Sequence, residues 1–83
     1  MLRLRIKEVA EAKGIGQGKL ARAADMAPNT LRDLYRDPYR AISVTTLNKL
    51  AKALNVPVTE LIEDVSEEFA KAEQEKIRKA AEK

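Results

Sequence analysis

Apolar residues recur along the chain at intervals of three or four positions and do not alternate with polar residues as they would in an amphipathic strand. Five such stripes are present: Leu2, Ile6, Val9 and Ala10; Leu20, Ala21 and Ala24; Leu31, Leu34 and Tyr35; Leu47, Leu50, Ala51 and Leu54; and Val58, Leu61 and Ile62. This spacing matches the 3.6-residue period of a helix with one buried face. The pattern therefore predicts five short helices, no strands and an all-α fold.

Residues that start or stop helices separate the stripes. The first stripe ends at Gly14, a residue type that commonly follows the last turn of a helix. The third opens at Pro28 and stops before Pro38, because proline fits the first turn of a helix but not its interior. Ser43 is placed to cap the fourth stripe, and Asn55 can adopt the left-handed conformation that ends it.

The end of the chain has a different composition. After Pro57, where the fifth stripe begins, there is no Gly or Pro, and residues 66–83 are rich in Ala, Glu and Lys, which are good helix formers. Two i,i+4 ion pairs support a helix here, Glu67 with Lys71 and Glu75 with Lys79. This segment is either a sixth helix capped by Ser66 or a continuation of the fifth. We expect one domain over residues 1–63 and a charged helical extension over residues 64–83.

The composition excludes most catalytic and metal sites. The 83 residues contain no Cys and no His, which excludes disulfides, imidazole or thiolate metal sites and cysteine nucleophiles. The only serines are Ser43 and Ser66, and there is no His to activate either. We therefore expect a protein that is not an enzyme and that uses no metal or cofactor.

Hydropathy and charge narrow the range of partners. No apolar run approaches the length of a membrane span, and the first residues are too charged for a signal peptide, so we expect a cytoplasmic protein. The net charge is +3, and it belongs to residues 1–64, because residues 65–83 carry equal numbers of basic and acidic groups. This excess permits an anionic partner without requiring one.

Residues 17–36, QGKLARAADMAPNTLRDLYR, have the pattern of two short helices joined by a tight turn. Helices that cross steeply need a small residue where they touch, and Ala21 is placed there. Met26, just before the second helix, can fill the core beneath the turn. The outer face of the second helix is then left free, as in a helix-turn-helix motif.

Two longer stretches resemble the Cro and lambda-repressor type of helix-turn-helix regulator, the XRE family. They are IKEVAEAKGIGQGKLARAADMAPNTL, which is similar to the opening of that family, and TTLNKLAKALNVPVTELI, which is similar to its fourth and fifth helices. The resemblance covers about residues 3–63 and leaves the extension outside. It implies a compact five-helix lambda-repressor-like domain, usually dimeric, with the third helix in the major groove of double-stranded DNA.

The same resemblance, carried over position by position, implies a set of DNA contacts. Asn29 can pair with adenine, Arg32 with guanine, and Asp33 either accepts from cytosine or orients a neighbouring arginine. Gln17 matches the family's phosphate-clamping glutamine at the start of the second helix, where free N–H groups favour an anion. The other implied contacts to the DNA backbone are Thr30, Arg36, Tyr39, Arg40 and Thr45.

Four residues depart from the family pattern. Asp25 stands where a Gly is usual in the turn, although Asp is among the few other residues that enter the left-handed region. Ala27 removes the side-chain cap of the third helix at a cost of about 1 kcal/mol, and Pro28 offsets part of this by fixing φ while displacing a polar residue that often reads a base. Gly18, together with Gly16, either lets a phosphate approach the backbone closely or is a chance substitution that a stable bundle tolerates.

Three functions fit these observations. The first is a sequence-specific regulator, a repressor that acts as a homodimer on a near-palindromic operator. The second is an antitoxin-like interaction module that grips a toxin-like protein through the helix of residues 65–83. The third is a helix-turn-helix scaffold without DNA activity, because residues 28–36 carry a net charge of only +1.

Overall fold

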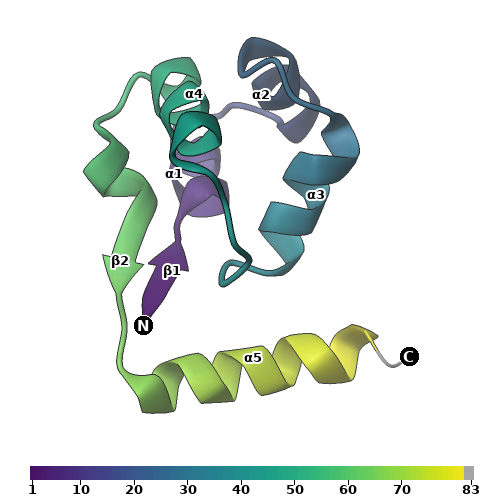
Figure 1. The fold of residues 1–83 in the computed structure, drawn as a ribbon. Helices are drawn as coiled ribbons and strands as arrows, with labels where there is room; N and C mark the ends of the chain where they lie inside the picture. Colours follow the sequence, from purple (N-terminus) through teal and green to yellow (C-terminus); the bar gives the residue numbers. More distant parts are fainter. Residues whose placement is uncertain (82–83) are drawn as a thin grey trace.

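The computed structural model describes residues 1–81 and is mostly helical, which confirms the predicted fold class. In chain order the elements are β1 (Leu2–Leu4), α1 (Ile6–Ala12), α2 (Gln17–Ala23), α3 (Pro28–Arg36), α4 (Val44–Leu54), the 3₁₀ turn η1 (Val58–Leu61), β2 (Ile62–Asp64) and α5 (Glu67–Ala81). Helices α1 to α4 form a bundle, and α5 lies across one end of it (Figure 1).

The core is aliphatic, and each element from β1 to η1 contributes to it. Its buried members are Leu4, Ile6, Ala10, Leu20, Ala21, Ala24, Leu31, Leu34, Leu50, Ala51, Leu54 and Leu61. Within residues 1–81 no polar or charged residue is fully buried. The bundle is therefore held together mainly by burial of apolar surface, which favours folding in proportion to the area removed from water.

A short antiparallel sheet pairs the segment before α1 with the segment after η1, so the expectation of no strands is wrong. Leu4 pairs with Ile62 and faces the core, whereas Arg3 pairs with Glu63 on the opposite face of the sheet. Leu2, which the spacing assigns to the first helical stripe, lies in β1. A strand of three residues is too short for its alternation to stand out from helical spacing.

The fifth expected helix is a single 3₁₀ turn, η1. It follows Pro57 and buries Leu61, but at Ile62 the backbone becomes extended, with φ −132° and ψ 150°. The carbonyl oxygen of Leu61 accepts a hydrogen bond from the N–H of Arg5 at 2.7 Å. Pairing with the start of the chain thus replaces the bonds that a longer helix would need here.

Local signals at the helix ends act as the sequence predicts. Gly14, just after α1, has a φ of 68°. The hydroxyl of Ser43 accepts a hydrogen bond from the N–H of Thr46 at 3.0 Å and so caps α4. Asn55 ends α4 in the left-handed region, with φ 56°.

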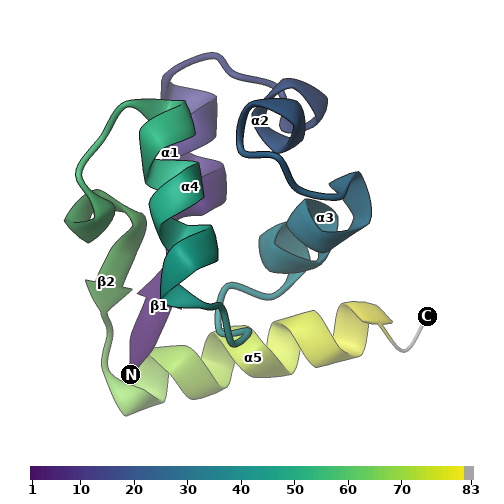
Figure 2. The ribbon, with the colours of Figure 1, turned by 45° about the horizontal axis from the view of Figure 1, so that its top comes forward.

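Helix α5 is separate from η1, which resolves the alternative left open by the sequence. Ser66 caps it, with its hydroxyl 3.1 Å from the N–H of Phe69. Ala70 is 0% exposed, so the first half of α5 packs closely on the rest of the molecule. Figures 1 and 2 show α5 running from the sheet, past the loop between α3 and α4, to the end of α3. A cleft separates the last turns of α5 from the end of α3. The cleft is lined by Arg36, Ile77, Ala80 and Ala81.

Candidate nucleic-acid interface

Helices α2 and α3 form the two-helix unit expected from residues 17–36. Ala21 of α2 is 0% exposed, and its carbonyl oxygen accepts a hydrogen bond from the N–H of Met26 at 3.0 Å. Asp25 adopts φ 54°, which is the left-handed turn conformation that the sequence requires of it. Met26 is half-buried and packs against the core. This geometry leaves α3 on the outside of the bundle (Figure 2).

Helix α3 has one buried face and one open face. Leu31 and Leu34 are 0% and 4% exposed, so they fix the helix to the core. Arg32 and Arg36 are exposed, and within residues 1–81 neither forms a salt bridge. Two guanidinium groups on one face of an exposed helix are therefore available to carboxylate, phosphate or guanine acceptors.

The amino-terminal turn of α3 is polar and exposed. Asn29 and Thr30 lie in this turn with exposed side chains, and Asp33 is half-buried in the next. Ala27 precedes the helix without any side-chain cap, and Pro28 is its first residue, as expected. A base-reading role for these residues remains a prediction.

Gln17 begins α2, after Gly16 in an extended conformation, and its side chain is half-buried. A Cβ added at Gly16 would meet nothing within 4 Å, and one at Gly18 would meet only Nη1 of Arg22 at 3.7 Å. The backbone at this end of α2 therefore faces open space, and neither glycine is required by local crowding.

The loop between α3 and α4 is held by contacts on two sides. The N–H of Leu4 donates to the carbonyl oxygen of Pro38 at 2.7 Å. The hydroxyl of Tyr39 donates to Oε1 of Glu73, on α5, at 2.6 Å. Arg40 follows in this loop with an exposed side chain, and Thr45 is exposed in the first turn of α4. The predicted contacts thus lie along the α2, α3 and α4 segments, but the Tyr39 hydroxyl already has a partner.

Arg3 and Glu73 form a polar connection that sequence reasoning missed. Nε and Nη2 of Arg3 donate to the two carboxylate oxygens of Glu73 at 2.7 and 2.9 Å. The same guanidinium also pairs with Glu8 and Glu63. Arg3 is only 14% exposed and Glu73 25% exposed, so solvent screens this pair less than a surface pair. No local signal could have found it, because the two residues lie at opposite ends of the chain.

This network shifts the protonation of its members. The hydrogen bonds from Arg3 lower the pKa of Glu73 below its ordinary value of 4.5, against an opposing effect of burial. Burial and the bond to Glu73 raise the pKa of Tyr39 to about 12. Arg3 stays protonated throughout, since its pKa is also raised. The connection therefore consists of a carboxylate, a guanidinium and a neutral phenol at neutral pH.

The network makes stability depend on pH in a predictable direction. A carboxyl group whose pKa is depressed on folding stabilises the protein above its unfolded pKa, and this contribution is lost as pH falls through the folded pKa. We expect the wild-type chain to be more stable than Glu73→Gln at pH 7 and this difference to shrink below about pH 4.5. Urea unfolding from about pH 7 to about pH 3 measures the difference. The matched control is Glu75→Gln, whose carboxylate is 55% exposed in the wild type. The prediction would be contradicted if both variants differed from the wild type in stability by the same amount and this amount did not change with pH.

Other kinds of site are not found in the part of the chain that the structure describes. Residues 1–81 contain no group of Asp and Glu side chains that could hold a metal ion. Over the same residues no helix has the length and apolar character to cross a membrane.

Helix α3 is half exposed, and a left-handed turn joins it to α2, in which a small residue is buried. This arrangement is that of the helix-turn-helix class of DNA-binding domains. Comparison with known families agrees: the sequence model of the Cro/C1-type HTH DNA-binding domain matches residues 5–67. The chain therefore belongs to the Cro/C1-type helix-turn-helix family, and DNA is the partner that this family binds. A comparison with curated proteins finds no match.

Proposed function

We propose that the protein is a sequence-specific transcriptional regulator of the cytoplasm, a repressor that acts as a homodimer on a near-palindromic operator. The observation that carries this proposal is the open face of α3, where exposed Arg32 and Arg36 have no ion-pair partner within residues 1–81. In the proposed complex α3 enters the major groove. The two copies of α3 in a dimer then meet successive grooves about 34–36 Å apart.

Each polar residue of this surface has a proposed role. Asn29 and Arg32 read base edges, because an amide and a guanidinium form bidentate pairs with adenine and guanine respectively. Asp33 accepts from a cytosine amine or orients a neighbouring arginine. Contacts with the phosphate backbone, which fix register rather than sequence, are proposed for Gln17, Thr30, Arg36, Arg40 and Thr45.

We propose residues 1–63 as the DNA-binding domain and residues 64–83 as its extension. A second candidate function, capture of a toxin-like protein by the extension, is favoured by Phe69, which is 53% exposed on α5. An exposed aromatic ring of this kind is a common anchor for a partner. The protein has no proposed catalytic role.

Selection from a randomised duplex pool by the purified chain, followed by sequencing, tests the proposal. An enriched two-fold motif with half-sites about 10 base pairs apart, centre to centre, is the expected result. Enrichment of a single half-site would support sequence-specific binding and contradict a preformed dimer. No enrichment by protein that circular dichroism shows to be folded overturns the regulator and favours the interaction module.

A further inference from the structure

Two neighbouring residues anchor the loop that follows the recognition helix. The carbonyl oxygen of Pro38 is bonded to β1, and the hydroxyl of Tyr39 is bonded to Glu73 of α5. Arg40, a proposed phosphate contact, follows Tyr39 directly in this loop, whereas Arg36, another, is the last residue of α3. The position of the Arg40 backbone therefore depends on where β1 and α5 hold the loop, whereas α3 itself places Arg36.

Tyr39 cannot serve the carboxylate and a phosphate at the same time. A phenol has one hydrogen to donate, and Tyr39 gives it to Oε1 of Glu73 at 2.6 Å. A phosphate that approached this hydroxyl would also meet the negative charge of Glu73. Direct contact between Tyr39 and the DNA backbone would thus require α5 to be released from the loop.

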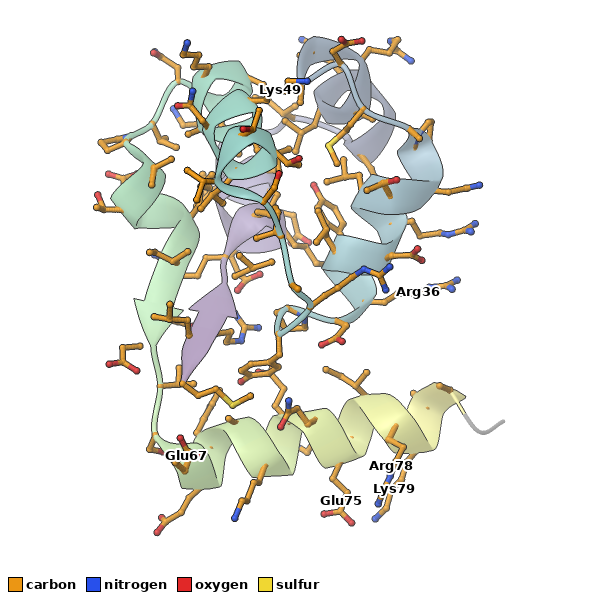
Figure 3. All side chains as sticks on the ribbon, viewed as in Figure 1. Arg36, Lys49, Glu67, Glu75, Arg78 and Lys79 are labelled. Atoms are coloured by element: carbon orange, nitrogen blue, oxygen red, sulfur yellow. The ribbon has the colours of Figure 1, made fainter. Side chains whose placement is uncertain are left out.

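The attachment of α5 is specific enough to define one loop position. Glu73 is held by two hydrogen bonds from Arg3 in the fork geometry that fixes orientation as well as distance. One turn earlier on the same face, Ala70 is 0% exposed. The opposite face of α5 makes no such attachment: Glu75, Arg78 and Lys79 point away from the bundle (Figure 3).

We infer that Glu73 is a positioning residue of the DNA interface, which acts through Tyr39 to hold the loop of residues 37–42 where Arg40 meets the phosphate backbone. This inference rests on the proposed DNA-binding function. In this arrangement α5 supports the DNA-binding surface without contacting DNA through Glu73. Tyr39 has a supporting role in place of the direct phosphate contact expected from the sequence.

The size of the effect follows from loop ordering. Without the Tyr39 to Glu73 bond, the loop must be ordered at the moment of binding, and each long side chain immobilised at an interface reduces affinity. We expect a loss of operator affinity of between about threefold and tenfold for each single variant. If the Arg40 contact is lost in both subunits of the proposed dimer, the slope of log affinity against log salt concentration should fall in magnitude by up to about 2.

The experiment measures affinity for the selected operator by fluorescence anisotropy, at several salt concentrations, for Tyr39→Phe, Glu73→Ala and the double variant. Tyr39→Phe removes only the hydroxyl, so it preserves the ring and the fold. Glu75→Ala is the matched control, because it removes the same charge from the same helix and, within residues 1–81, its carboxylate forms salt bridges only with Arg78 and Lys79, each at 3.8 Å. Thermal unfolding establishes that every variant is folded at the assay temperature.

The expected result is that both single variants weaken binding to a similar extent, that the double variant is no weaker, and that Glu75→Ala binds as the wild type does. A loss in Tyr39→Phe without a loss in Glu73→Ala would overturn the inference and make Tyr39 a direct phosphate contact. Additive losses, or no loss in either variant, would overturn it as well. Failure of the proposed function is a separate outcome, since the wild-type chain would then select no operator.

Discussion

Replacing Arg32 with alanine is expected to abolish operator recognition while leaving the protein folded. Arg32 is exposed on α3 and forms no salt bridge within residues 1–81, so its removal disturbs no contact that holds the bundle together. A bidentate arginine–guanine pair contributes about 1–3 kcal/mol of discrimination, and a dimer would lose it in both half-sites, roughly 2–6 kcal/mol in all. Anisotropy with the selected operator measures the loss, and urea unfolding establishes that stability is unchanged.

Two further variants separate base reading from general charge. Arg78→Ala removes the same charge from a side chain that is 70% exposed and points away from the bundle, and it should bind the operator nearly as the wild type does. Arg32→Lys keeps the charge but not the bidentate geometry, so it should retain the salt dependence and lose the preference for the operator. Wild-type affinity in Arg32→Ala would remove Arg32 from the base-reading set.

The elements that were correctly predicted are those specified by neighbouring residues. The cap by Ser43 and the left-handed turns at Asp25 and Asn55 each depend on a side chain and the backbone within a few positions. The burial of Ala21 was also predictable, because a steep helix crossing needs a small residue in a fixed place in the motif. These local signals bound α4 and the turn that leads into α3.

The sheet could not be predicted because its information is distributed between the two ends of the domain. Leu2 fits a helical stripe equally well until its pairing with Asp64 in the sheet is known. The same pairing ends η1 after one turn, so the unpredicted sheet and the shortness of the fifth helix have one cause. Strand pairing between distant segments has no periodic signature in a run of three residues.

The sequence predicts the polar residues of the candidate site, but it does not predict the contacts that hold the loop after α3. The polar residues of α3 follow from the motif: Asp33 is half-buried, and the others, Asn29, Thr30, Arg32 and Arg36, are exposed. Tyr39 was expected at the DNA backbone because of its place after the recognition helix, yet its hydroxyl is bonded to Glu73. A tail of alternating charge usually indicates a solvated helix face, and nothing in its pattern distinguishes Glu73 from Glu75.

Replacing Leu31 with alanine should have the largest effect on stability of any change in α3. Leu31 is 0% exposed in the core, next to Arg32 in sequence but on the opposite face of the helix. Removing a buried leucine leaves a cavity and costs about 2–5 kcal/mol, a large part of the roughly 5–15 kcal/mol that stabilises a typical domain. Urea unfolding measures the loss. The control is Val44→Ala, which truncates an aliphatic side chain that is 83% exposed and should change stability by less than about 0.5 kcal/mol.

Operator binding then distinguishes a damaged fold from a damaged surface. Leu31→Ala keeps every polar group on the open face of α3, so its folded fraction should bind the operator as the wild type does. Because a ligand that binds only the folded state stabilises it by mass action, excess operator should raise the unfolding midpoint of Leu31→Ala. The same operator should not raise the midpoint of Arg32→Ala, which is folded but lacks the contact. If operator failed to stabilise Leu31→Ala, or if that variant unfolded like the wild type, α3 would not have the separate core and recognition faces on which the proposed function depends.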